Sequence, residues 1–162
     1  YNNTKDNPFN LYASTKLAFK KIVNYYSKKN NFTKFYNIYL MDTFGENDTR
    51  FKIINEIKKS IKINKPIKII SENLYLNVIN IKDIISGIYL MLTKPLNAGD
   101  YSLVNNKFFR IKDILRKINE KKKRKYKFAT KRKIKEKIFK FKKIKGWKPK
   151  YSNINNIADL VI

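Results

Sequence analysis

The feature that most constrains the fold is an alternation of short apolar runs with longer segments of helical period. In residues 50–64, Phe51, Ile54 and Ile57 recur at three-residue steps, which predicts an amphipathic helix. The run PIKII at 66–70 is short, rich in β-branched residues and bounded by polar residues, which is typical of a strand. Because strands and helices alternate along the chain, the sequence predicts an α/β fold.

The same patterns predict the remaining elements. Helices are expected at 9–29, 50–64, 82–92, 110–120 and 153–162, and strands at 35–41, 66–70, 76–81 and 100–104. Asn7 and Pro8 are expected to start the first helix, the strand at 35–41 to be buried, and residues 42–48 to form a turn at Gly45. A complete doubly wound domain needs more strands, and no Gly-rich phosphate loop is present, so the sequence indicates part of a fold.

The net charge of +26 raises the possibility of nucleic-acid binding. Ile, Lys and Asn supply 78 of the 162 residues, and Lys outnumbers Arg 33 to 5, which favours the codon bias of an A/T-rich genome instead. The run at 121–137 is the strongest candidate for a phosphate-binding patch, and a solvated surface segment is the favoured alternative. Its neighbouring aromatic residues fit either a buried strand face or a base-stacking surface: Tyr126, Phe128, Phe139 and Phe141.

Other function classes are limited by what the composition lacks. With no Cys and no His, the chain has no disulfide and no usual zinc site, so no metal is expected. No apolar run is long enough to span a membrane and no leader is visible, so no membrane contact and a cytoplasmic location are expected. The chain does not begin with Met, which suggests a truncated N-terminus.

Tyr12 and Lys16 are the candidate catalytic pair. A Tyr followed four residues later by a Lys occurs three times, at Tyr1/Lys5, Tyr12/Lys16 and Tyr25/Lys29, and about two such pairs arise by chance. An ammonium beside a phenol stabilises the phenolate, which can exchange a proton with a sugar or alcohol hydroxyl.

A helical wheel favours one of these pairs. It gathers one apolar face on the first helix: Tyr12, Thr15, Phe19, Ile22, Val23 and Tyr26. Lys16 lies within this face, whereas Lys20, Lys21 and Lys28 are expected to point away from it.

Several motifs then resemble one known family in the family's own order. NPFNLYASTKLAF (7–19) resembles the active-site helix of the extended short-chain dehydrogenases, the nucleotide-sugar epimerase/dehydratase family. LMDTFGENDTRFK (40–52), LNVINIKDII (76–85), GDYSLVNNKFFRIKDIL (99–115) and GWKPKYSNINNIADLV (146–161) resemble its later blocks, with Asp83 on a family Asp. The resemblance covers nearly the whole chain and implies the C-terminal half of an extended Rossmann-type enzyme, with the last strands of the parallel sheet and a small substrate-binding subdomain.

The resemblance also implies roles for individual residues. Tyr12 would be the catalytic acid/base, and Lys16 would bind the nicotinamide ribose and stabilise the Tyr12 phenolate. Leu40 and Met41 would line the cofactor site, and the substrate would contact Asp42, Thr43 and Arg50. Turn capping and a surface ion pair are the alternatives for Asp42 and Arg50. Departures from the family pattern are Phe44, Glu46, Leu76 and the segment Asn80-Ile81-Lys82-Asp83.

The implied whole is an NAD- or NADP-dependent epimerase, dehydratase or reductase acting on a nucleotide-activated sugar, possibly as a homodimer. Residues 1–65 would supply the active-site helix and the remaining Rossmann elements, and residues 66–162 mainly the substrate-binding part. The dinucleotide-binding half and its pyrophosphate-binding loop would lie outside the chain, so the chain alone would be inactive. The alternatives are a basic nucleic-acid-binding or scaffold module and a non-functional enzyme fragment.

Overall fold

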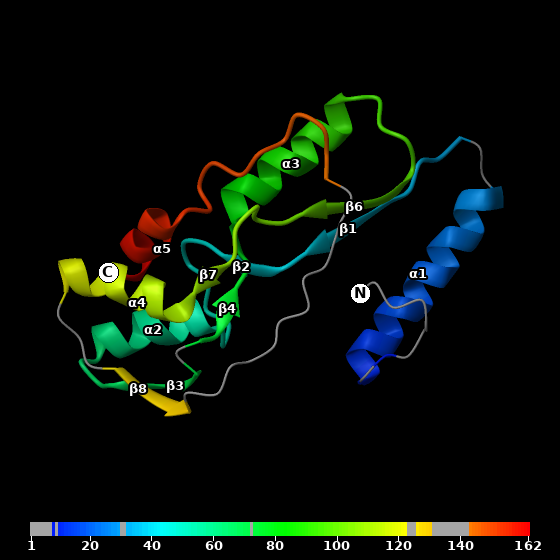
Figure 1. The fold of residues 1–162 in the computed structure, drawn as a ribbon. Coiled ribbons are helices and arrows are strands. Elements are labelled where there is room, and N and C mark those ends of the chain that lie inside the picture. The colour runs from blue at the N-terminus through cyan, green and yellow to red at the C-terminus, as the bar shows by residue number, and fades with distance from the viewer. Residues whose placement is uncertain (1–7, 9, 30–31, 72, 123–125, 131–142) are drawn as a thin grey trace.

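The structure is a computed structural model that describes residues 8, 10–29, 32–71, 73–122, 126–130 and 143–162, with residues 126–130 described by their backbone alone. Helices and strands alternate along the chain (Figure 1). The helices are α1 (Leu11–Lys29), α2 (Ile53–Lys62), α3 (Ile81–Thr93), α4 (Ile111–Lys121) and α5 (Ile154–Val161). The strands are β1 (Tyr36–Leu40), β2 (Asp42–Phe44), β3 (Ile67–Ser71), β4 (Tyr75–Leu76), β5 (Val78–Asn80), β6 (Gly99–Leu103), β7 (Phe109–Arg110) and β8 (Tyr126–Thr130).

The strands form short pairs that are mostly parallel. β1 pairs with β6, β2 with β5 and β3 with β8 in parallel register, and β4 pairs with β7 in antiparallel register. Met41 separates β1 from β2, so the chain changes its neighbouring strand at this residue. The predicted α/β class is therefore confirmed.

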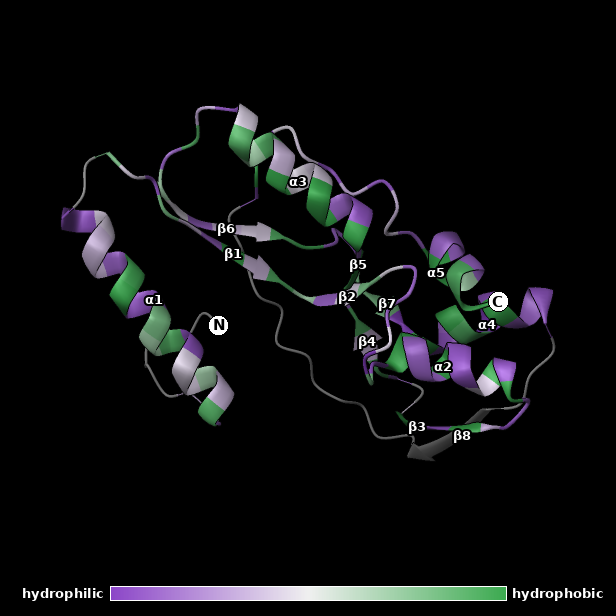
Figure 2. Cartoon of the chain, turned by 180° about the vertical axis from the view of Figure 1, so that it is seen from behind, coloured by the Kyte–Doolittle hydropathy of each residue, from purple (hydrophilic) through white to green (hydrophobic). Residues whose placement is uncertain are grey.

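Helices α1 and α3 lie on opposite sides of the β1–β6 pair (Figures 1 and 2). α1 runs antiparallel to β1, so the start of the helix lies toward the carboxyl end of the strand (Figure 1). The expected start of this helix at Asn7 and Pro8 is wrong, because the Asn10 side chain accepts a hydrogen bond from the Ala13 amide at 2.8 Å and caps a helix that begins at Leu11.

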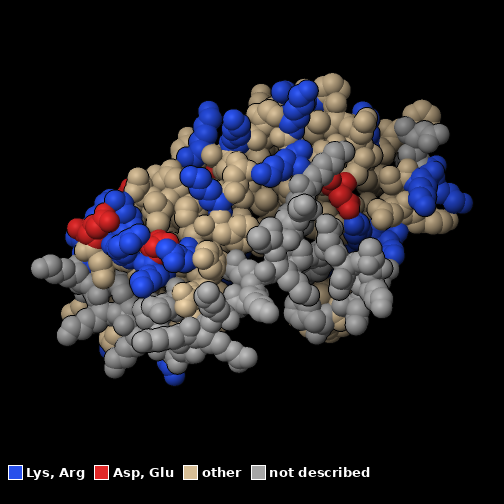
Figure 3. Space-filling model, viewed as in Figure 1, with Lys and Arg blue, Asp and Glu red and all other residues tan. Residues whose placement is uncertain are grey.

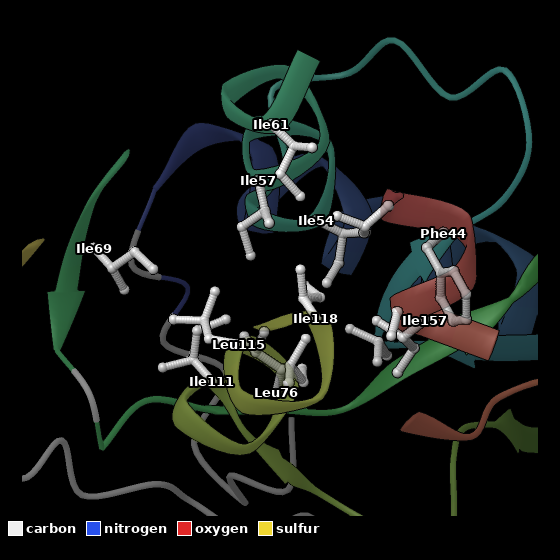
Figure 4. Close-up of a cluster of buried hydrophobic side chains, with 14 residues drawn as sticks. Phe44, Ile54, Ile57, Ile61, Ile69, Leu76, Ile111, Leu115, Ile118 and Ile157 are labelled. Atoms are coloured by element: carbon white, nitrogen blue, oxygen red, sulfur yellow. The ribbon is translucent and has the colours of Figure 1, made fainter. Parts of the chain in front are cut away.

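Helices α2, α4 and α5 enclose the larger hydrophobic core, drawn in Figure 4. The helical period brings Ile54, Ile57 and Ile61 to one face of α2. The corresponding face of α4 carries Ile111, Ile114, Leu115 and Ile118. Phe51, which the sequence places on the α2 face, is 90% exposed because the helix begins only at Ile53.

A smaller core lies between α3 and β6. Its buried residues are Ile79, Ile84, Met91, Tyr101, Leu103 and Ile144. Gly87 on α3 permits this packing, because a Cβ at that position would lie 2.3 Å from Leu103 Cδ2. Helix α3 thereby covers the β1–β6 pair on one side.

Asp83 fixes the segment that leads into α5. This residue is 1% exposed, and its carboxylate accepts hydrogen bonds from the amides of Lys150 (2.7 Å) and Tyr151 (3.0 Å). The same carboxylate accepts a hydrogen bond from the Ser152 hydroxyl. One buried acid thus connects the start of α3 to residues 150–152.

Several predicted boundaries need correction. The expected strand at 76–81 is two strands, β4 and β5, and Ile81 already belongs to α3. Residues 42–44 form β2 and not part of a turn. The expected buried strand at 35–41 is only partly buried, with Ile38 36% and Leu40 45% exposed, because β6 covers one edge of β1.

The surface carries many basic side chains. Figure 3 shows Lys and Arg spread over several elements of one face. Most of the run at 121–137, and the side chains of Tyr126, Phe128, Phe139 and Phe141, lie outside the described residues. Within the described part of the chain, no helix combines the length and apolarity needed to cross a membrane.

Candidate functional site

The candidate site lies at the carboxyl end of β1. Leu40 ends this strand, Met41 is half-buried, and Asp42 and Thr43 open β2 beside β5. In open parallel α/β sheets, ligands bind beyond the carboxyl ends of the strands. The sequence-predicted residues Leu40, Met41, Asp42 and Thr43 all lie at this end of β1, where the chain leaves β6 and pairs with β5.

Tyr12 and Lys16 occupy the end of α1 that lies toward the same side. The Tyr12 side chain is 66% exposed, and the Lys16 ammonium lies 5.5 Å from the centre of the Tyr12 ring. Lys20, one turn further along α1, contacts Tyr39 on β1 at 2.6 Å. Because a helix rises about 1.5 Å per residue, Lys16 lies ~6 Å and Tyr12 ~12 Å from this contact along the helix axis, toward the carboxyl end of β1.

The second described pair, Tyr25 and Lys29, has the same local contact. Its ammonium lies 5.4 Å from the ring centre, so the contact itself does not separate the two pairs. Tyr25 is thirteen residues after Tyr12, roughly 20 Å further along the helix and toward the amino end of β1. Position relative to the strand, and not the Tyr–Lys contact, therefore distinguishes Tyr12. Tyr1 and Lys5 lie outside the described residues.

The apolar face predicted for α1 is exposed. Phe19 is 62%, Ile22 54% and Tyr26 57% exposed, whereas Ala13 is buried. Lys20, which the helical wheel places away from the apolar face, faces the β1–β6 pair. The residues of α1 that face these strands are thus not those of its most apolar stripe.

Asp42 and Arg50 each take part in an ion pair. Lys52 Nζ lies 3.1 Å from Asp42 Oδ1. Arg50 donates to both carboxylate oxygens of Asp48, at 2.8 and 2.7 Å, and to the Thr43 hydroxyl at 2.7 Å. The Arg50 hydrogen bond, although partly offset by burial, holds the pKa of Asp48 well below its usual range. These contacts fix the turn after β2 beside Thr43.

The residues that depart from the family pattern have structural roles. Phe44 is 2% exposed and Leu76 is 6% exposed, and both belong to the larger core. Glu46 is exposed and accepts a hydrogen bond from Lys82 at 3.0 Å. Asn80 caps α3 by accepting a hydrogen bond from the Lys82 amide at 2.9 Å. Among the described residues, no group of three or more metal-ligating side chains is present.

With parallel strands, flanking helices and polar residues at a strand's carboxyl end, the chain belongs to the Rossmann-like α/β class. The sequence pattern of the NAD dependent epimerase/dehydratase family matches residues 1–105, and the chain is a member of that family.

Known proteins support this assignment. The chain is 29% identical over 117 residues to CDP-abequose synthase of Yersinia pseudotuberculosis, a match that covers 70% of this chain and 40% of that protein. The solved structure of dTDP-glucose 4,6-dehydratase from Bacillus anthracis with NAD matches 99% of this chain and 54% of its own, at 16% identity and a TM-score of 0.72. UDP-glucose 4-epimerase from Thermotoga maritima with UDP-glucose matches 93% of this chain and 52% of its own, at 13% identity and a TM-score of 0.74. The chain thus spans about half the length of these relatives.

Sequence reasoning missed Lys20, Tyr39 and Asp100. Asp100 Oδ2 lies 2.5 Å from Lys20 Nζ and accepts a hydrogen bond from the Tyr39 hydroxyl at 3.2 Å. The alternation of β1 carried a usable signal, because the polar residues Asn37 and Tyr39 lie on one face of the strand. A polar strand face beside a helix predicts a polar helix residue opposite it.

Proposed function

We propose that this chain carries the proton-transfer pair and part of the substrate site of an NAD- or NADP-dependent epimerase, dehydratase or reductase acting on a nucleotide-activated sugar. The position of Tyr12 and Lys16, toward the carboxyl end of β1 where Leu40–Thr43 also lie, carries the proposal. The names of the relatives supply the substrate class, because they act on sugars linked to CDP, dTDP or UDP.

The residues at this end of the molecule fit the nicotinamide–ribose part of such a cofactor. The exposed phenol of Tyr12 and the ammonium of Lys16 can donate hydrogen bonds to ribose hydroxyls. The bound nicotinamide would supply the site that gives or accepts a hydride. In the direction of sugar oxidation, the Tyr12 phenolate would accept the hydroxyl proton from the sugar, while the Lys16 charge stabilises the phenolate.

The pyrophosphate of the cofactor would be bound elsewhere. None of the chain's four glycines forms a phosphate loop at the start of a helix: Gly45 and Gly87 permit close contact with Ile81 and Leu103, and Gly99 and Gly146 have positive φ angles of 144° and 86°. We therefore propose that the pyrophosphate is held by the part of the fold that the solved relatives have in addition to the part matched here.

The substrate would contact the segment between β1 and α2. Thr43 and Arg50 are held together, so the guanidinium, with its side chain 57% exposed, is fixed at the end of β2. A guanidinium in this position suits the diphosphate of a nucleotide sugar. Asp42, whose carboxylate pairs with Lys52, would accept a hydrogen bond from a sugar hydroxyl.

The proposal is tested by assaying the assembled enzyme, by which we mean this chain together with the part of the fold that would hold the pyrophosphate. CDP-, dTDP- and UDP-linked hexoses would each be incubated with NAD and NADP, in parallel with the free hexoses. We expect turnover of at least one nucleotide sugar, detected by product analysis and by absorbance of the reduced cofactor at 340 nm, and none of the free hexoses. Turnover of free hexoses alone, or of no compound in the series, would overturn the substrate class.

A further inference from the structure

We propose that Lys20, Tyr39 and Asp100 form a positioning cluster. This cluster sets the position along the helix axis, and the rotation about it, of the Tyr12–Lys16 pair relative to the carboxyl end of β1. The cluster joins three elements, because Lys20 lies on α1, Tyr39 on β1 and Asp100 on β6. The inference rests on the proposed function, because it concerns where the same pair is held. We do not place Lys20, Tyr39 or Asp100 in contact with substrate or cofactor.

The contacts within the cluster are mutual. Lys20 Nζ donates to Tyr39 Oη at 2.6 Å and to Asp100 Oδ2 at 2.5 Å. The Tyr39 hydroxyl donates to the same carboxylate oxygen at 3.2 Å, and Asn37 Nδ2 donates to Asp100 Oδ1 at 2.9 Å. Each of the three main members is thus bound to the other two, which restricts the Lys20 side chain more than a single surface ion pair would.

The charge states suit this arrangement. Partial burial on its own would lower the pKa of Lys20, but the hydrogen bonds to Asp100 and Tyr39 outweigh it and raise this pKa. Burial would likewise raise the pKa of Asp100, and the hydrogen bonds from Lys20 and Asn37 outweigh it and lower this pKa. Lys20 and Asp100 therefore remain charged near neutral pH, so the cluster is intact there.

Apolar packing alone holds α1 only weakly against the strands. Phe19, Ile22 and Tyr26 are each more than half exposed, and Ala13 is the α1 residue whose side chain is buried. Hydrophobic burial is also non-directional, so it sets the register of a helix on a strand less sharply than a charged hydrogen-bonded contact. Lys20 provides this contact one helical turn from Lys16.

A small slip of the helix has a large effect at the site. Moving α1 by one residue shifts Tyr12 by about 1.5 Å and rotates it by roughly 100° about the helix axis. A misplacement of about 1 Å can cost on the order of a hundredfold in rate. Lys20 fixes both the shift and the rotation, because it contacts two strands at once.

The kinetic test uses the assembled enzyme and compares Lys20→Met with Lys28→Met, an exposed lysine on the same helix. We expect Lys20→Met to lower kcat about tenfold, with the KM for the nucleotide sugar within about twofold of wild type. Lys20→Arg and the exchange of Lys20→Asp with Asp100→Lys should recover most of the lost rate, and Lys28→Met should change nothing. Should Lys20→Met fail to fold, Tyr39→Phe removes one hydroxyl and should still lower kcat several-fold.

A distance measurement tests the same inference without activity. The chain has no Cys of its own, so spin labels on Lys28→Cys in α1 and Lys58→Cys in α2 are the only labels within it. We expect one narrow distance distribution in the parent protein and a broader or shifted one with Lys20→Met. Unchanged distances and full activity in Lys20→Met, with activity lost in Tyr12→Phe, would overturn the positioning cluster alone. Full activity in Tyr12→Phe would instead overturn the proposed function.

Discussion

At the residue scale, the buried carboxylate of Asp83 shows how a polar side chain can specify a long-range contact. Two backbone amides and one hydroxyl of residues 150–152 donate to it, 67 or more positions away in sequence. The Trp147 indole also donates to the Asp83 carbonyl oxygen at 3.2 Å. One residue thus holds the path between α3 and α5.

Asp83→Ala should lower the free energy of unfolding by about 3 kcal/mol, because two partly buried amides and one buried hydroxyl lose their acceptor. Asp159→Asn should cost less than about 1 kcal/mol, because Asp159 pairs with Lys121 at the surface and both side chains are about half exposed. Urea unfolding of the two variants measures both values. Equal losses would contradict the assigned role of Asp83.

The turn after β2 gives a pH-dependent prediction. Because folding holds the pKa of Asp48 below the unfolded value of about 3.9, the Arg50 contact stabilises the turn above that pH, and the stabilisation is lost as the pH falls through the folded pKa. We expect the carboxyl carbon of Asp48, followed by NMR, to report an ionised group at pH 3. In Arg50→Gln the midpoint should move up toward 3.9, and an unchanged midpoint would contradict the assignment.

At the element scale, α3 packs against β6 through a position where only glycine fits. Gly87→Ala should destabilise the protein by about 1–3 kcal/mol, because the new methyl group would overlap Leu103 and approach Trp147 Nε1 within 3.1 Å. Helix propensity alone predicts the opposite sign, a gain of about 1 kcal/mol.

Thermal unfolding of Gly87→Ala decides between these two signs. Thr93→Ala, at an exposed position of the same helix, is the control and should change the unfolding free energy by less than about 0.5 kcal/mol. A Gly87→Ala protein that is more stable than wild type would show that α3 is not held closely against β6.

The hydrophobic patterns in the sequence predicted most helices and strands, but not which of their faces are covered. The apolar residues of α2 and α4 recur at regular helical steps, and the faces that carry them pack within this chain. The buried residues of these helices could therefore be predicted from the sequence. The apolar stripe predicted for α1 is instead exposed, because a period shows which residues share a face and not what covers that face. The exposure of Ile38 and Leu40 on β1 has the same origin, since the pattern of this strand does not reveal what lies beside it.

The candidate site was predictable to a similar extent. The resemblance of residues 7–19 to a family motif made Tyr12 and Lys16 candidates, and the structure places residues 40–43 at the carboxyl end of β1. The link between α1 and the strands could not be predicted from helix period, because Lys20 lies off the apolar stripe and Asp100 is 80 residues away in sequence.

At the scale of the whole molecule, the chain contains about half of the fold of its solved relatives. The exposed faces of α1 and β1 and the lack of a glycine phosphate loop lead to one prediction for the chain by itself. Titration calorimetry with NAD and NADP should show binding far weaker than that of the assembled enzyme, because the pyrophosphate has no backbone cradle here. Equal affinity in the two preparations would contradict the proposed division of the cofactor site.

We propose that location at the carboxyl end of β1, and not the Tyr–Lys spacing, makes Tyr12 the proton-transfer residue. Helix α1 contains its own control, because Tyr25 has the same residue type, the same spacing to a lysine and nearly the same ring contact. The most direct measurement is kcat of Tyr12→Phe and Tyr25→Phe in the assembled enzyme. We predict a loss of about 10²–10⁴-fold for Tyr12→Phe and a value within about twofold of wild type for Tyr25→Phe. Full activity in Tyr12→Phe, or equal losses in both variants, would contradict the claim.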